Sequence, residues 1–402
     1  MGDWLQEMEG GVTAPRGLQA AGVTAGVKAR GKDLALIYSP ARAAAAGVFT
    51  TNRVKAAPVL LTRSRLARGE AHAVVVNSGN ANACTGPEGY RDAVAMAELA
   101  AAELGVPPHA VLVASTGIIG QRLPMERLAR GIKRAAKNLS PQGGADAARA
   151  IMTTDTRPKQ LAVEFQLKGR PVRVGAMAKG AGMIGPHLAT MLAVITTDAL
   201  VPAPLLGQCL GQAVEHSFNC ITVEGDTSPN DMVLLLANGQ AEAGEISPRR
   251  GLRRFQQALD HVCRGLARAI AADGEGATKL ISLTVKGAAS FPQARQVALT
   301  VANSPLVKTA IFGGDPNWGR VLAAAGRAGV RLKPELLELW IGPAQVVKAG
   351  QATNRDCRRA ARALAGPRVD LTLDLNQGNQ QATVWTCDLT YGYIELNAEY
   401  HT

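Results

Sequence analysis

A glycine-rich segment near the middle of the chain has the residue types of a phosphate-binding or catalytic loop. Gly180, Gly182 and Gly185 formally match the G-x-G-x-x-G pattern of dinucleotide-binding folds. That fold needs a helix that begins at the last glycine. Here Pro186 follows at once, and the β-branched run at 194–197 predicts a strand instead. We therefore reject a dinucleotide site, and the sequence contains no G-x-x-x-x-G-K-[S/T] phosphate loop either.

The same segment contains a threonine that could act as a nucleophile. Thr190 lies between the glycine-rich turn and the apolar strand predicted after it. A threonine hydroxyl needs an adjacent base. The threonine's own α-amino group, with a pKa of about 8, becomes that base once the Ala189–Thr190 bond is cut. From the residues alone an ordinary strand threonine is the simpler interpretation, because Ala-Thr is a common dipeptide.

Cysteine and histidine are too scattered to form a metal site. The six cysteines include no Cys-x-x-Cys pair, and the six histidines form no His-Glu-x-x-His helix, so we expect no metal. Residues 1–11 are acidic and lack the apolar core of a signal peptide. Scattered thiols without a signal peptide favour a cytoplasmic protein. No apolar run is long enough to cross a bilayer, so no membrane partner is expected.

The net charge of +12 raises the question of nucleic-acid binding. The basic residues are denser at 122–137, 249–254 and 355–362, in Ala-rich and Arg-rich stretches typical of solvated helix faces. Aromatic residues make up only 4% of the chain, and none is interleaved with a basic strand to stack on bases. We therefore expect no nucleic-acid partner, and only a general attraction for acidic small molecules.

The 402 residues are enough for two or three structural units. Alternating and buried-type runs predict strands at 72–76, 111–114, 161–166, 172–177, 280–285, 337–341, 369–374 and 381–396. Helices are predicted at 87–105, 124–137, 143–152, 203–217, 251–272, 303–312, 317–328 and 345–365. Turns at 77–80 and 115–117 are expected to end the first two strands. This pattern indicates a mixed α/β (α+β) protein with antiparallel pairing, not a doubly wound parallel sheet.

Several long stretches, spread in order over nearly the whole chain, resemble one known family. They are GVTAP (11–15) with AGV (21–23), NSGNANACTG (77–86), STGIIG (115–120), TTDT (153–156), KGAGMI (179–184) with ATML (189–192), EGDTSPND (224–231), DGEGATK (273–279), GGDPNWGR (313–320) and NAEY (397–400). Patterns of this length do not recur by chance. The chain resembles the ornithine acetyltransferase family, the glutamate N-acetyltransferases of arginine biosynthesis.

The resemblance implies a fold, a processing step and a reaction. Members cut themselves before the threonine that matches Thr190, which implies an α chain of residues 1–189 and a β chain of residues 190–402. Within the β chain, about 280–402 form a smaller α/β unit. The implied fold is αββα-layered, like that of N-terminal nucleophile hydrolases, and the implied assembly is an α2β2 heterotetramer.

The implied reaction is a ping-pong transfer of acetyl from N-acetylornithine to glutamate, releasing ornithine and N-acetylglutamate. It needs no cofactor, although some members also take the acetyl group from acetyl-CoA.

The resemblance also assigns roles to single residues. Thr190 is the nucleophile, Ala189 and Thr190 flank the cleaved bond, and Thr116 and Gly117 form the oxyanion hole. The implied substrate contacts, besides Thr190, are Thr153, Lys179, Glu275, Asn397 and Thr402. The register leaves Thr154 as the alternative to Thr153. Glu275 is expected to face an amino group of the substrate. Lys179 is expected either to hold a substrate carboxylate or to lower the pKa of the nearby amine.

Two other classes of function stay open at this stage. A self-processing amidase or aminopeptidase of the related fold would pass the acyl group to water. A non-enzymatic binding protein would remain a single uncut chain.

Overall fold

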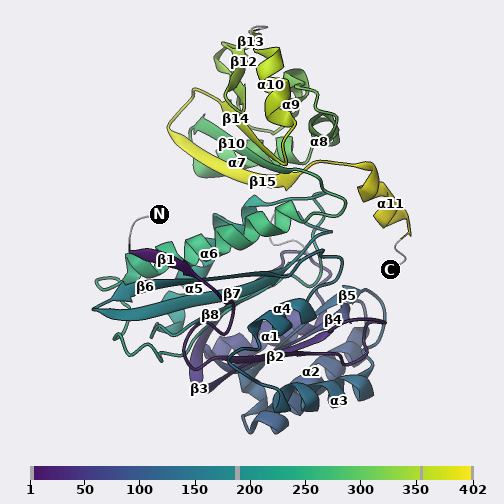
Figure 1. Ribbon diagram of the computed structural model, residues 1–402, viewed down its shortest axis with the longest axis vertical. Helices are drawn as coiled ribbons and strands as arrows, with labels where there is room; N and C mark the ends of the chain where they lie inside the picture. Colours follow the sequence, from purple (N-terminus) through teal and green to yellow (C-terminus); the bar gives the residue numbers. More distant parts are fainter. Residues whose placement is uncertain (1–3, 186–190, 354–355, 400–402) are drawn as a thin grey trace.

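The computed structural model describes residues 4–185, 191–353 and 356–399, and contains two sheets (Figure 1). Within these residues the larger sheet has nine strands. In spatial order they are β1 (Leu5–Met8), β6 (Lys159–Leu167), β7 (Arg170–Lys179), β8 (Leu192–Thr197), β9 (Met232–Ala237), β3 (Leu34–Phe49), β4 (Glu70–Asn80) and β5 (Val111–Ile118), with β2 (Gln19–Val23) paired to β3.

The smaller sheet comes from the last third of the chain. In spatial order its strands are β13 (Gln351–Ala352), β12 (Ala344–Lys348), β11 (Glu338–Ile341), β14 (Arg368–Asp374), β10 (Leu280–Ala288) and β15 (Gln380–Cys387). Across both sheets the pairs β4–β5, β8–β9 and β10–β14 are parallel, and the other named pairs are antiparallel. The prediction of a mixed α/β protein with antiparallel pairing is confirmed.

Eleven α-helices and four short 3-10 helices complete the described part of the chain. The α-helices are α1 (Ala57–Arg65), α2 (Gly86–Leu104), α3 (Met125–Lys137), α4 (Gly144–Ala150), α5 (Ala203–Glu215), α6 (Leu252–Ala272), α7 (Phe291–Ala302), α8 (Pro305–Phe312), α9 (Trp318–Gly326), α10 (Cys357–Leu364) and α11 (Tyr391–Glu399). Helix α2 has a proline in its first turn and ends at Gly105 in the left-handed region, as its start and stop signals predict.

The larger sheet is folded over so that its two halves face each other. Met177 and Val194 from one half share a buried cluster with Val76 and Leu112 from the other. Because neighbouring strand residues point to opposite faces, the alternate residues of these strands face outward. Helices α5 and α6 cover one outer face, and α2 and α3 cover the other. The result is the αββα layering expected from the family resemblance.

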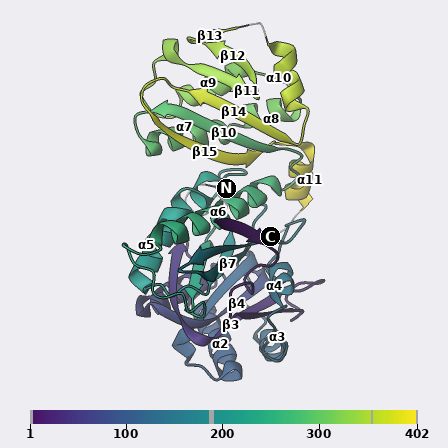
Figure 2. The same ribbon diagram turned by 60° about the vertical axis from the view of Figure 1, so that its left-hand side comes forward.

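Helix α6 also connects the two sheets. It packs against β6 and β7 on one side and against β10 and β15 on the other, and one apolar cluster runs through it from sheet to sheet. Figure 2 shows α6 between the two sheets, with α11 extending from the smaller sheet toward the larger one. The C-terminal segment thereby returns to the unit that contains the glycine-rich segment.

Three sequence predictions about local structure were wrong. The expected helix at 345–365 is a β-hairpin, β12 and β13, followed by the short helix α10, because residues 344–348 pair with β11. The expected strand at 381–396 ends at Cys387, where Asp388 turns the chain by accepting the backbone N–H groups of Thr278 and Lys279. The expected turns at 77–80 and 115–117 belong to β4 and β5.

The alanine-rich strand β3 was not anticipated at all. Its residues 43–46 are four consecutive alanines, a composition that favours a helix. They form a strand because β9 pairs with them on one side and the first residues of β4 pair with them on the other. Tertiary pairing thus overrides local preference here.

Part of each of the three basic stretches lies on an exposed helix face, although Arg122, Arg249 and Arg250 lie outside the helices. The exposed helix residues include Arg253 and Arg254 at the start of α6, and Arg358 and Arg359 in α10. No helix of the described residues is long and apolar enough to span a membrane.

Candidate active site

The two residues predicted to form the oxyanion hole lie near the end of strand β5, and not in a turn as the sequence suggested. Thr116 is buried and pairs with Ser78 of β4, while Gly117 pairs with Gly79. Gly117 has a φ of +132°, and a Cβ atom there would overlap the backbone of Gly79. Only glycine fits this position, so β4 and β5 stay paired through it.

Three predicted residues from distant parts of the chain meet at one buried ammonium group. Lys179, the last residue of β7, is 2% exposed. Its Nζ donates to Oγ1 of Thr153 at 2.7 Å and to Oγ1 of Thr116 at 3.4 Å. Of the two candidate threonines, Thr153 therefore contacts Lys179. The end of α4, which precedes Thr153, is held by the Ser78 hydroxyl, which donates to the carbonyl of Ala150 at 2.7 Å.

Among the described residues, no carboxylate contacts the Lys179 ammonium directly. None of the ion pairs in the described part of the chain includes it, and its two hydrogen-bond partners are neutral hydroxyls. Burial lowers the pKa of Lys179, and the nearby Asp155 carboxylate opposes that shift. A buried ammonium without an ionic partner is a ready site for an anionic group.

A buried ionic network lies beside Lys179. Lys159 donates to Oδ1 of Asp155 and to Oδ2 of Asp273, both at 2.6 Å. Asp155 also accepts the backbone N–H of Gly180 at 2.7 Å and that of Thr153 at 3.0 Å. The network thus joins the Thr153 loop, the end of β7 and the segment at Asp273.

Glu275 follows Asp273 closely and contacts the C-terminal helix. Asn397, in α11, donates to Oε2 of Glu275 at 3.0 Å. The backbone N–H of Glu275 donates to the carbonyl of Ala181 at 2.9 Å. A Cβ atom at Gly182 would overlap the Glu275 carboxylate. The glycine-rich segment therefore leaves room for this acid, and the structure brings the two predicted substrate contacts Glu275 and Asn397 together.

The predicted nucleophile Thr190, together with Ala189 and the terminal Thr402, lies outside the described residues. The residues on either side of this gap are held by acids. Met191 donates its backbone N–H to Oδ1 of the buried Asp231 at 3.0 Å. Ile184 donates its N–H to Oε1 of Glu224 at 2.7 Å.

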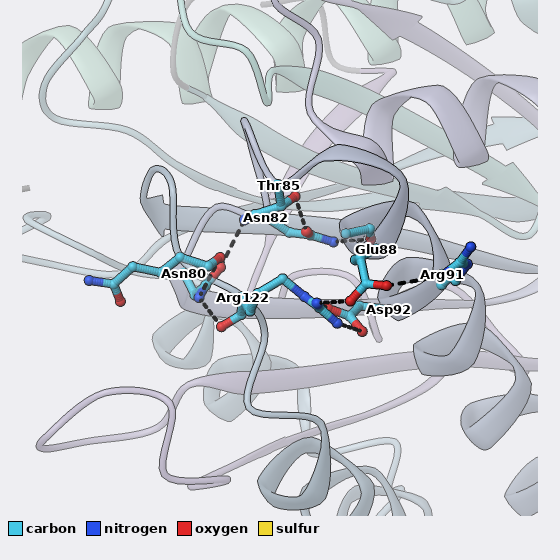
Figure 3. Close-up of polar contacts among 9 residues, drawn as sticks. Asn80, Asn82, Thr85, Glu88, Arg91, Asp92 and Arg122 are labelled. Carbon is cyan, nitrogen blue, oxygen red and sulfur yellow. Dashed lines mark hydrogen bonds and ion pairs between the residues drawn. The ribbon is translucent and has the colours of Figure 1, made fainter.

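The loops that follow β4 and β5 are tied together by polar side chains (Figure 3). Asn80 donates to the carbonyl of Arg122 at 3.1 Å, and the Arg122 guanidinium forms a two-point ion pair with Asp92 of α2 at 2.7 and 2.9 Å. Asn82 accepts from the Thr85 hydroxyl at 2.7 Å. These contacts join the segment at 80–92 to the segment that follows β5, the strand that contains Thr116.

Sequence reasoning gave no role to several acids and one lysine of this site. Asp155, Asp231 and Asp273 lie inside the stretches that carry the resemblance, so their position there was an available signal. Lys159 lies in none of them, and only its burial between two carboxylates identifies it. No group of three or more potential metal ligands is found within residues 4–185, 191–353 and 356–399.

Comparison with known proteins is decisive for the family. A model of the ArgJ family matches residues 19–402. This chain belongs to the ArgJ family. The arginine biosynthesis bifunctional protein ArgJ of Symbiobacterium thermophilum is 55% identical to it over 404 residues, which cover 100% of both chains. The family resemblance inferred from the sequence is confirmed.

Two solved structures of similar sequence are related to parts of the chain. The arginine biosynthesis bifunctional protein ArgJ of Bacillus halodurans is 41% identical, with a TM-score of 0.50 over 51% of this chain and 97% of its own. The ornithine acetyltransferase of Mycobacterium tuberculosis, solved in complex with ornithine, is 47% identical, with a TM-score of 0.42 over 45% of this chain and 98% of its own. The first of these likenesses shows that about half of this chain shares an ArgJ fold.

Proposed function

We propose that this protein moves the acetyl group of N-acetylornithine to glutamate through an acetyl ester on Thr190, after cutting itself at Ala189–Thr190. The overall activity follows from the family. Its curated relatives are bifunctional ArgJ proteins of arginine biosynthesis, so this chain is an ornithine acetyltransferase and a glutamate N-acetyltransferase. The route through Thr190 and the roles of single residues are the proposal.

The buried ammonium of Lys179 is the observation that supports the proposal most directly. It lacks an ionic partner among the described residues and contacts Thr116 and Thr153. N-acetylornithine and glutamate both carry an α-carboxylate, so one cation can bind each of them in turn. Because Lys179 donates to the Thr116 oxygen, the Thr116 hydroxyl proton remains free to donate to an oxyanion.

Self-cleavage is proposed to begin with attack of the Thr190 hydroxyl oxygen on the Ala189 carbonyl carbon. The C–N bond breaks, the hydroxyl proton passes to the departing amine, and an ester forms. Water then hydrolyses the ester, which leaves a carboxyl group on Ala189 and a free hydroxyl and α-amine on Thr190. The Bacillus halodurans chain supports this step, because 97% of it matches only 51% of the present chain.

Acetyl transfer is proposed to use the same groups twice. The Thr190 oxygen attacks the acetyl carbonyl of N-acetylornithine, and its proton passes through the α-amine to the departing amine of ornithine. The α-amine of glutamate then attacks the ester and takes the acetyl group, and its proton returns to the Thr190 oxygen. Thr116 and the N–H of Gly117 stabilise the oxyanion in both steps, a contribution of about 3 to 4 kcal/mol per donor.

Glu275 and Asn397 are proposed to bind the rest of the substrate. They form one polar pair beside the glycine-rich segment. The Glu275 carboxylate suits the cationic end of ornithine, and the proposed contact from Thr402 comes from the same C-terminal segment.

Mass spectrometry and steady-state kinetics test the covalent route. The purified protein should contain two chains, residues 1–189 and 190–402, without added protease. N-acetylornithine alone should add one acetyl group to the 190–402 chain, and double-reciprocal plots with glutamate should be parallel. Thr190→Ala should remain one chain without transferase activity. Intersecting lines without an acetylated chain would indicate direct transfer in a ternary complex.

The same assays separate the two alternative functions. A self-processing amidase would release acetate from N-acetylornithine equally fast with and without glutamate. A binding protein would remain a single uncut chain with no turnover.

Further parts of the proposal concern the second activity, the assembly and the location. We propose acetyl-CoA as the additional acetyl donor, which a thiol-release assay with glutamate tests. We also propose that the chain divides into residues 1–189 and 190–402, with about 280–402 as a smaller unit, and that the two parts pair as α2β2. Light scattering of the cut protein tests this assembly. All six cysteines carry free thiols, which fits the reducing cytoplasm, and cell fractionation tests that location.

A further inference from the structure

Asp155 occupies a position that no substrate-binding role explains. Its Oδ1 accepts from Lys159 at 2.6 Å and from the backbone N–H of Gly180 at 2.7 Å. Its Oδ2 accepts the backbone N–H of Thr153 at 3.0 Å. Thr153 and Lys179 are joined by the 2.7 Å hydrogen bond described above. Asp155 therefore holds the backbone of Thr153 and the backbone of Gly180, the residue that follows Lys179.

The charges around this point nearly cancel. Lys159 and Lys179 are buried cations, and Asp155 and Asp273 are the buried carboxylates between and beside them. Asp273 is occupied by Lys159 and by the N–H and hydroxyl of Thr156. Asp155 lies beside both lysines, and it is the carboxylate that offsets Lys179 most strongly.

The other charged groups near Lys179 do not replace Asp155. Asp231 and Glu275 favour its charged form less strongly than Asp155 does, while Lys159 opposes it. Lys28, whose Nζ donates to the carbonyl of Met152 at 3.0 Å, adds another positive charge close by. Without Asp155, buried positive charge would be in excess, and the most weakly paired lysine would lose its proton.

We propose that Asp155 is a positioning residue that keeps Lys179 protonated and aligned with Thr153, so that the site can bind the α-carboxylate of either substrate. This inference rests on the proposed role of Lys179. It gives Asp155 no contact with the substrate.

The pKa values of the two groups agree with this arrangement. Burial alone raises the pKa of Asp155, but Lys179, Lys159 and the N–H of Gly180 together outweigh it and lower the pKa to about 2. Burial lowers the pKa of Lys179, and Asp155 is the largest influence in the opposite direction. Asp155 therefore stays ionised throughout the working pH range, and it supports the charge of Lys179.

The test measures the Michaelis constant for glutamate as a function of pH in the cut protein. In the unmodified protein this constant should rise where Lys179 loses its proton. Asp155→Asn keeps the shape and one acceptor but removes the charge, so the rise should move to lower pH by about one unit or more, which is a tenfold change in protonation. Asp155→Glu restores the charge and should move the rise back toward its original pH.

A second variant should shift the same curve the other way. Lys159→Gln keeps donors for Asp155 and Asp273 but removes a positive charge that disfavours protonated Lys179. The rise should then move to higher pH. Because the two shifts have opposite signs, a general loss of stability cannot produce both.

Asp198→Asn is the matched control. Asp198 is also buried and accepts backbone N–H groups, from Arg173 at 2.7 Å and Arg16 at 3.1 Å, but it follows the far end of β8. The Asp198→Asn variant should leave unchanged the pH at which the Michaelis constant for glutamate rises. A folded, cut Asp155→Asn protein with the original pH dependence would overturn the inference.

Lys179→Met separates this inference from the proposed function. If Lys179→Met leaves the Michaelis constant for glutamate unchanged, the proposed carboxylate contact is wrong. If Lys179→Met raises it strongly while neither Asp155→Asn nor Lys159→Gln shifts the pH dependence, only the role of Asp155 is wrong.

Discussion

The backbone N–H of Met191 donates to Oδ1 of Asp231 at 3.0 Å. Met191 directly follows the proposed nucleophile, and Asp231 immediately precedes β9, the parallel neighbour of β8. Asp231 is fully buried, and burial raises its pKa well above the usual value. Its Oδ2 has no hydrogen-bond partner among the described residues. The chain just after the proposed cleavage point is therefore anchored by one buried carboxyl group.

Loss of this anchor should slow self-cleavage. Asp231→Ala removes the acceptor for Met191, and a hydrogen bond of about 1 to 3 kcal/mol predicts cleavage that is roughly tenfold slower or more. Asp231→Asn retains an acceptor oxygen and should cut faster than the alanine variant. A gel time course of freshly synthesised protein measures the rates. Equal rates for Asp231→Ala and the unmodified protein would show that the anchor is unnecessary.

Thr116→Ala should reduce turnover more than substrate binding. The hydroxyl is proposed to act mainly in the transition state, so kcat should fall by about 10²- to 10³-fold with little change in KM. Because Lys179 retains its contact with Thr153, the ammonium should stay in place. Steady-state kinetics of the cut variant provide the measurement. A change confined to KM would assign Thr116 to substrate binding instead.

Gly182→Ala should displace Glu275. The added Cβ would overlap the Glu275 carboxylate, which must then move away from its contact with Asn397. We expect KM for N-acetylornithine to rise by about tenfold, as for the loss of a charged hydrogen bond. Gly211→Ala in α5 is the control, since its Cβ would meet no atom within 4 Å. If both variants bind N-acetylornithine normally, Glu275 does not face the donor.

Glu224 should make stability depend on pH. Burial raises the pKa of Glu224 to about 8, and the N–H of Ile184 only partly opposes this. The folded state therefore keeps the Glu224 proton that the unfolded state releases near pH 4.5. The contribution of this group to the free energy of unfolding is complete below that pH and is lost as the pH rises toward 8. Glu224→Gln should therefore gain melting temperature relative to the unmodified protein between pH 5 and 8. Parallel melting curves across that range would refute this.

Much of the molecule was predictable from local patterns. Helix α2 follows from its proline start and glycine stop, and the hairpin β6–β7 follows from alternation around Lys168 and Gly169. The family followed from long stretches such as residues 77–86 and 224–231, because the types and spacing of their residues are unusual. The sequence by itself therefore determined the class of fold, the family and the names of most candidate site residues.

Only the tertiary structure decided how those residues meet. Thr116 and Lys179 are 63 positions apart, and their contact depends on the strands β5 and β7 approaching at one end of a folded-over sheet. No local pattern specifies that a lysine will be buried, or that Asp155 will lie beside it. Burial is a property of the packed layers, and it places the Lys179 ammonium where it has no ionic partner among the described residues, which is the basis for its proposed role in binding a carboxylate.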